Sequence, residues 1–145
     1  MALESRPMMR FYDIDAADAA IPELDGILAR LAGQRTELVR LRDEVMTGRG
    51  SSERASTAVS DRSTPELRFT RLRMQGLIDQ MAADVARIDA LGLTLRDIEH
   101  GLVDFPALVS GRQIWLCWRR GEWAIGWWHG LDTGFSGRRP LSALA

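Results

Sequence analysis

Residue types that bind metals gather in the C-terminal part of the sequence. His129 and Asp132 are three positions apart, and Cys117 lies a short distance before them. Imidazole, thiolate and carboxylate groups are ligands of zinc and iron, so these three residues form a candidate metal site. Further possible ligands lie upstream, at Asp97, Glu99, His100 and Asp104.

The spacing of these residues does not define a metal site by itself. The sequence has no CxxC, HxxxH or HExxH motif, so folding would have to bring the ligands together from separate segments. The alternative is that His129 hydrogen-bonds Asp104 or Asp132, while Cys117 is a small core residue. We favour this alternative, on which no cofactor is expected, and keep zinc or iron as the second hypothesis.

Nucleophilic catalysis is a weaker hypothesis. A Cys117–His129 pair would need a thiol at a cleft with a lowered pKa. Cys117 lies between Trp115 and Trp118 in the sequence, and such surroundings are typical of a buried, unreactive cysteine. We therefore favour a protein that is not an enzyme.

The tryptophans are concentrated in one segment, between positions 115 and 128. The runs 113–119 and 122–128 flank Arg120-Gly121, and a two-residue turn containing glycine predicts a β-hairpin. In that hairpin Trp118 would lie opposite Trp123, and both faces would be apolar. Since bare indole surface is unfavourable in water, the second face needs a cover: the C-terminal tail, a second copy of the chain, or a ligand.

Self-association is the function that this pattern favours. We expect an interaction or assembly protein that forms a dimer, with two helical hairpins pairing as a four-helix bundle. The predicted interface consists of the tryptophans and the turn arginines: Trp115, Trp118, Trp123, Trp127, Trp128, Arg119 and Arg120.

Binding of RNA is a further alternative. Trp118, Arg119, Arg120 and Trp123 would place indoles beside guanidinium groups, which could stack on bases and contact phosphates. The formal net charge of −1 argues against a protein built mainly to bind nucleic acid.

Two helices are predicted before this segment. Asp15 is expected to cap a short turn at 15–20, and Pro22 to begin a helix that ends near Met46. Residues 48–64, rich in Gly, Ser and Thr, predict a flexible linker. Ser63 or Thr64 then caps a second helix that ends at Gly92 and pairs antiparallel with the first.

The predicted fold class is α+β: a long antiparallel helical hairpin packed with a small β-hairpin of two or three strands. Residues 98–111 are expected to form a turn-rich connection before it. The chain of 145 residues is expected to be one domain. Its segments are a first helical part at 10–47, the linker at 48–64, a second helix at 65–91, and the hairpin and tail at 93–145.

Composition excludes several classes of function. The sequence contains no lysine, which excludes a Schiff-base lysine and a phosphate-binding P-loop lysine. The single cysteine excludes an internal disulfide. No signal peptide or membrane-spanning stretch is recognisable, so a cytoplasmic location is expected.

The C-terminal half resembles a known family. The string GLVDFPALVSGRQIWLCWRRGEWAIGWWHGLDTGFSGRRPL is similar to the signature of the bacterial and archaeal domain of unknown function 2203. The matching segments are GLVDFPA, LCWR.GE..IG.WH and D.GF.GR.PL, and FYDIDAADAAIPEL resembles the opening of that family. The resemblance spans nearly the whole chain and implies no particular reaction or catalytic residue.

Overall fold

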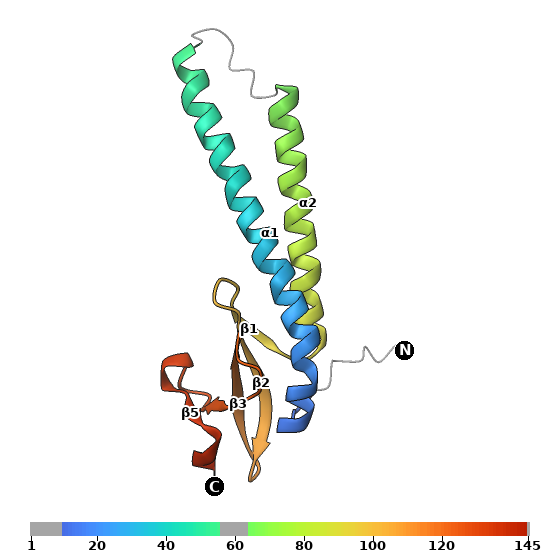
Figure 1. Cartoon of the computed structure of the whole chain (residues 1–145), viewed down its shortest axis with the longest axis vertical. Coiled ribbons are helices and arrows are strands. Elements are labelled where there is room, and N and C mark those ends of the chain that lie inside the picture. Colours follow the sequence, from blue (N-terminus) through green and yellow to red (C-terminus); the bar gives the residue numbers. More distant parts are fainter. Residues whose placement is uncertain (1–9, 56–63, 145) are drawn as a thin grey trace, which may run out of the picture. The chain divides into compact units, whose positions relative to one another are not determined.

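The computed structural model describes residues 10–55 and 64–144 (Figure 1). Two long helices are followed by a five-stranded antiparallel sheet, which confirms the predicted α+β class. By contacts the chain divides into two compact units, Met1–Ala29 with Val85–Ala145, and Arg30–Asp84. The elements are α1 (Ile14–Ala55), α2 (Pro65–Ala90), β1 (Thr94–Asp97), β2 (Leu102–Val109), β3 (Arg112–Arg119), β4 (Trp127–His129), η1 (Phe135–Gly137), β5 (Arg139–Pro140) and η2 (Leu141–Leu144).

Helix α1 begins earlier than predicted. The carboxylate of Asp13 accepts the backbone N–H of Ala16 at 2.7 Å, so Asp13 caps the helix and Asp15 lies in its first turn. The expected separate turn at 15–20 is wrong, because Pro22 lies inside one continuous helix. Proline removes a hydrogen bond there, but the apolar face on either side of it is buried, and that packing outweighs the loss.

The end of α1 also differs from the prediction. The helix continues to Ala55, through the first part of the stretch expected to be a linker. The rest of that stretch, residues 56–63, lies outside the described residues.

Both ends of α2 follow local rules and confirm the prediction. Thr64 Oγ1 accepts the backbone N–H of Leu67 at 3.2 Å, and Pro65 is the first helical residue. At the other end Gly92 has a φ of 78°. Its N–H donates to Asp89 (2.9 Å) and the N–H of Leu93 donates to Ile88 (3.3 Å), which together form a Schellman motif.

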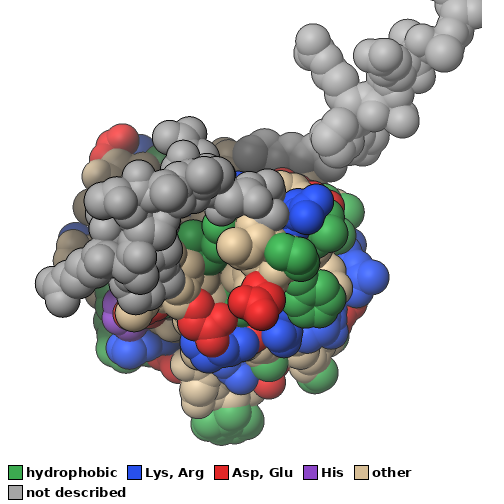
Figure 2. Space-filling model, turned by 90° about the horizontal axis from the view of Figure 1, so that it is seen from above, with side chains coloured by type: hydrophobic (Ala, Val, Ile, Leu, Met, Phe, Trp, Pro, Cys, Tyr) green, Lys and Arg blue, Asp and Glu red, His purple; other side chains and the backbone are tan. Residues whose placement is uncertain are grey.

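The unit Arg30–Asp84 is an antiparallel helix pair, as predicted. Arg30 pairs with Asp84 at 3.3 Å, and Arg73 pairs with Glu37 at 3.0 Å. The α2 side of the seam repeats every three or four residues, but its members are only half-buried: Leu67, Thr70, Met74, Leu77 and Met81. Hydrophobic side chains also lie open on the molecular surface among arginines and acidic residues (Figure 2).

The sheet has the strand order β1-β2-β3-β4-β5, and every pair is antiparallel. Ser110 and Gly111 connect β2 to β3 with φ values of 52° and 78°, which is the pattern of a type I′ hairpin turn. The connection predicted at 98–111 is therefore wrong over most of its length, since residues 102–109 form β2. The strand is hard to predict from the sequence because it contains Asp104 and Pro106, and both residue types are rare in sheets.

Pro106 is tolerated in β2 because it lies beyond the stretch that pairs with β1. Its carbonyl accepts the backbone N–H of Tyr12 at 2.7 Å. In an antiparallel strand the N and C=O of one residue point to the same side, so Pro106 withholds no hydrogen bond from β3.

The predicted turn at Arg120-Gly121 is present, since the N–H of Glu122 donates to the carbonyl of Arg119 at 3.0 Å, but the strand pairing predicted across it is wrong. Strand β3 pairs with β4 at residues 127–129, in the register Trp115↔His129 and Cys117↔Trp127. Residues 120–126 form a loop, and the N–H of Ile125 in this loop donates to the carboxylate of Asp18 at 2.7 Å. Trp118 therefore pairs across the sheet with Val103 and not with Trp123.

The tryptophans have different environments. Trp118 is 1% exposed and Trp123 is 92% exposed, while the other three are half-buried. An arginine lies over each of these three rings, with centroid distances of 5.1 Å for Arg96 over Trp115, 4.5 Å for Arg138 over Trp127 and 5.9 Å for Arg139 over Trp128. The C-terminal tail, one of the three covers considered for the predicted hairpin, therefore covers two of these rings. Strand β1 covers the third.

No helix in the described part of the chain combines the length and the apolar character that crossing a membrane requires.

Candidate metal centre

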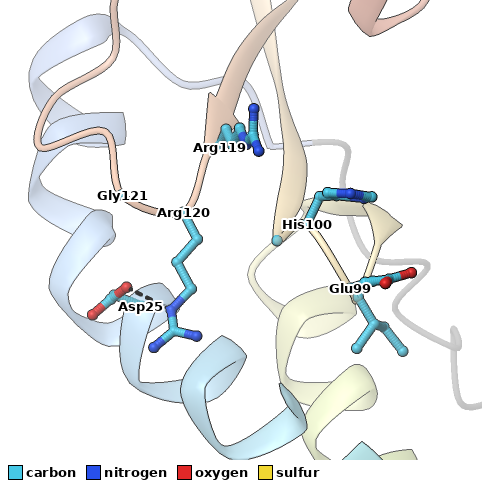
Figure 3. A pocket seen from close by; sticks show the side chains of 8 residues that line it. Asp25, Glu99, His100, Arg119, Arg120 and Gly121 are labelled. Carbon is cyan, nitrogen blue, oxygen red and sulfur yellow. Dashed lines mark hydrogen bonds and ion pairs between the residues drawn. The ribbon is translucent and has the colours of Figure 1, made fainter.

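The upstream ligand candidates of the sequence separate into two places. Asp97 and His100 pair with each other at 2.6 Å, and His100 and Glu99 line a surface pocket together with Arg119 and Arg120 (Figure 3). Asp104 lies elsewhere, inside the sheet. The predicted ligand Asp132 is exposed and is outside the cluster that Asp104 joins.

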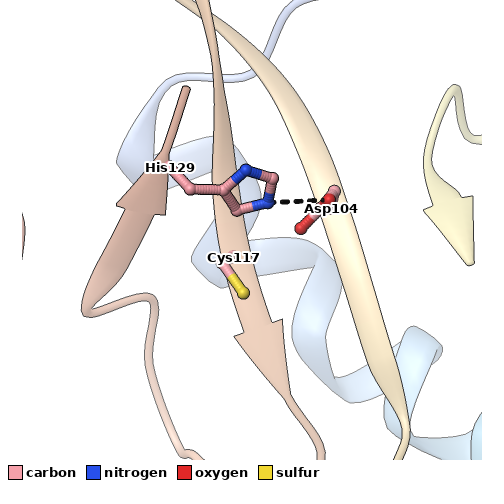
Figure 4. Close-up of side chains that lie close together, drawn as sticks. All are labelled: Asp104, Cys117 and His129. Atoms are coloured by element: carbon pink, nitrogen blue, oxygen red, sulfur yellow. Dashed lines mark hydrogen bonds and ion pairs between the residues drawn. The ribbon is translucent and has the colours of Figure 1, made fainter. Parts of the chain in front are cut away.

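Three strands bring Asp104, Cys117 and His129 together on one face of the sheet (Figure 4). Asp104 on β2 is directly opposite Cys117 on β3, and His129 on β4 is opposite Trp115, two residues before Cys117. Side chains alternate along a strand, so this register places all three on the same face. Asp104 and Cys117 are 2% exposed and His129 is 3% exposed, and their donor atoms all lie within 4.8 Å of one another.

The imidazole of His129 is held in one orientation. Its Nδ1 is 2.8 Å from the carbonyl oxygen of Gly130. A carbonyl only accepts hydrogen bonds, so Nδ1 carries a proton and Nε2 is the nitrogen that faces the cluster. Nε2 is 2.9 Å from Asp104 Oδ2, and these two electron-rich atoms need a cation between them, which can be a proton or a metal ion.

Asp104 is a buried carboxylate with a second charged partner. Arg96 Nε donates to the same Oδ2 at 2.8 Å. Burying a carboxylate is unfavourable unless it is paired, so Arg96 and His129 together account for the position of Asp104. The sequence left open whether His129 hydrogen-bonds Asp104 or Asp132, and the structure pairs it with Asp104.

Cys117 is a thiol at neutral pH. Burial, and then the negative charge of Asp104, raise its pKa to about 11, against the opposing effect of a hydrogen bond with Arg138. Both nitrogens of His129 are engaged, by Gly130 and by Asp104, so neither is placed to take a proton from Cys117. The arrangement does not favour a Cys–His nucleophile, but the three donor atoms could hold a metal ion, which can displace the thiol proton.

Asp104 is the residue of this cluster that the sequence placed in the wrong element. The predicted connection at 98–111 gives no reason to place Asp104 near Cys117. Had residues 102–109 been recognised as a strand ending at Ser110-Gly111, counting back from that turn would have placed Asp104 opposite Cys117.

The comparison with known families agrees with the resemblance found in the sequence. The family described as Uncharacterized conserved protein (DUF2203) matches residues 10–141. No curated protein and no solved structure matches the chain. The description names no reaction or ligand.

Proposed function

We propose that this chain, which belongs to the DUF2203 family, is a metal-binding protein in which Asp104, Cys117 and His129 hold one zinc ion. The observation that carries the proposal is the convergence of an oxygen, a sulfur and a nitrogen donor within 4.8 Å on one buried face. Tetrahedral zinc with bonds of 2.0–2.3 Å separates its ligand atoms by about 3.3–3.8 Å. The cluster therefore needs only small side-chain movements to reach that geometry.

Charge and orientation favour zinc over harder cations. Calcium and magnesium prefer all-oxygen sites, whereas mixed sulfur, nitrogen and oxygen ligands suit zinc. The carboxylate of Asp104 and the thiolate of Cys117 balance the two charges of the ion. Arg138 also lies near the thiol, but its positive charge is paired with Glu122 at 3.2 Å. The bond from His129 Nδ1 to Gly130 is the usual support for an imidazole that binds metal through Nε2.

Metal analysis tests this proposal. The purified chain, loaded with zinc and freed of excess by gel filtration, is expected to retain about one zinc per chain. His129→Ala is expected to retain less than about a tenth of that. Asp132→Asn is the matched control, because its carboxylate lies outside the cluster, and it should bind like wild type.

A second measurement separates loss of metal from loss of fold. Cobalt(II) bound by a thiolate gives a sulfur-to-metal charge-transfer absorption, which should appear with wild type and be absent in Cys117→Ala. Circular dichroism of the same samples reports folding. Failure of wild type to bind either metal, or equal loss of zinc in Asp132→Asn and His129→Ala, would overturn the proposal.

Self-association is a second function, favoured by the helix pair. Its seam residues on α2 stay half-buried, and the same unit exposes four large apolar side chains: Phe69 (69%), Leu72 (73%), Met46 (61%) and Ile78 (44%). Phe69 and Leu72 are three positions apart and so share one helix face. A second copy of the chain packed on this face would bury them as a four-helix bundle does.

Light scattering tests the dimer. Wild type at micromolar concentration is expected to have twice the mass of one chain, and Phe69→Glu with Leu72→Glu should convert it to a monomer. Leu108→Glu, an exposed apolar position on β2, is the control and should remain a dimer. A wild-type monomer would exclude this function and leave the metal proposal untouched.

A further inference from the structure

The loop after β3 exposes an aromatic ring a few positions after two arginines in the sequence. Trp123 is 92% exposed, three positions after Arg120 and four after Arg119. An indole bare to this extent is unfavourable in water, and Trp118, five positions earlier, is fully buried. The ring of Trp123 is therefore open to a ligand.

The backbone that carries Trp123 is firmly held. The N–H of Glu122 donates to the carbonyl of Arg119 at 3.0 Å, and the Glu122 carboxylate accepts the N–H of Arg119 at 2.7 Å. The indole N–H of Trp118 donates to the carbonyl of Glu122 at 2.7 Å. Binding at Trp123 would therefore not have to order this turn first.

A pocket of about 510 Å³ lies against the same turn, between it and residues 98–101. The two loops approach closely. The N–H of Arg120 donates to the carbonyl of Gly101 at 2.9 Å, and a Cβ at Gly101, which has a φ of +66°, would come within 2.6 Å of the Arg120 Cβ. The volume is in the range of small-ligand sites.

Arg119 carries the positive charge in this pocket that is available to bind an anionic ligand. Arg120 is paired with Asp25 at 3.2 Å, and His100 Nδ1 is paired with Asp97 at 2.6 Å. Within residues 10–47 and 64–144, the guanidinium of Arg119 has no ion-pair partner; it lies across the pocket from His100 (Figure 3). A free guanidinium presents a planar pair of N–H groups that matches a phosphate.

We infer that the turn binds a nucleotide, free or within a single-stranded nucleic acid, with a base stacked on Trp123 and a phosphate held by Arg119. Stacking on aromatic rings beside basic groups is how proteins bind unpaired nucleotides. The net charge of −1 belongs to the whole chain and does not oppose one local contact of this kind.

Fluorescence anisotropy with a labelled ten-nucleotide uridine strand at low salt tests this inference. Trp123→Ala and Arg119→Ala should each weaken binding by about tenfold or more, and Arg119→Ala should also reduce the salt dependence by about one phosphate contact. Arg112→Ala is the matched control, an exposed arginine at the opposite end of β3, and should bind like wild type. Competition by uridine monophosphate distinguishes a site for free nucleotides from one that needs a strand.

Two outcomes would overturn the inference. One is absence of binding by wild type at low salt and at protein concentrations up to about 100 μM. Even non-specific complexes with nucleic acid form at concentrations lower than this. The other is equal weakening of binding by Arg112→Ala and Arg119→Ala. That result would indicate non-specific attraction by positive charge and no defined binding site. Both substituted side chains of the site are exposed, so circular dichroism should show that each variant folds.

Discussion

Trp118→Ala is expected to lower the free energy of unfolding by about 3–5 kcal/mol. The ring is 1% exposed, and Trp118 lies opposite Val103 on β2. Its truncation leaves a cavity, and the carbonyl of Glu122 loses the indole N–H that it accepts at 2.7 Å. Urea unfolding followed by circular dichroism measures the change without relying on tryptophan fluorescence.

Trp123→Ala is the matched control for this experiment. It removes the same side chain from a position that is 92% exposed, so the free energy of unfolding should change by no more than about 0.5 kcal/mol. Similar losses in the two variants would show that Trp123 is covered in the folded protein. They would contradict the packing described for the 120–126 loop.

Asp104→Ala is expected to lower the free energy of unfolding by about 3 kcal/mol in the presence of a chelator, so that bound metal makes no contribution. The substitution leaves His129, which is 3% exposed, without the carboxylate that faces Nε2 at 2.9 Å. Arg96 loses the same partner, but its side chain is half-exposed and can turn toward water. We therefore expect the lower end of the range for a broken buried ion pair.

Asp132→Ala tests whether this loss is specific. Asp132 is exposed and lies outside the cluster, so its removal should leave the urea midpoint within the range of an ordinary surface change. If Asp104→Ala unfolds at the same urea concentration as wild type, the Arg96–Asp104–His129 network does not stabilise the fold, and the position of Asp104 would have to be explained by ligand binding alone.

The helices could be predicted because their signals are local. The Thr64 cap, Pro65 and the Gly92 stop act within one turn of the residues they affect, and all three have the predicted role. The prediction failed at Pro22, where the rule is also local but burial of the surrounding helix face overrides it.

The sheet could be predicted only in part. Gly121 adopts the positive φ expected of a turn glycine, at 106°, yet its turn leads into a loop because Glu122 and Ile125 are bound by Trp118 and Asp18. Asp18 is 107 positions from Ile125. A contact of that separation leaves no periodic or spacing signal in the sequence.

The amino-acid sequence alone determined the fold class, both ends of α2, the family, and the residue types from which a metal site could be made. The tertiary structure decided which of those residues meet. Asp104 joins Cys117 and His129, and Asp132 does not, because cross-strand register chooses neighbours through hydrogen bonds between distant segments. Trp118 is buried on a paired strand and Trp123 is exposed in a loop, a difference that two identical side chains cannot encode by themselves.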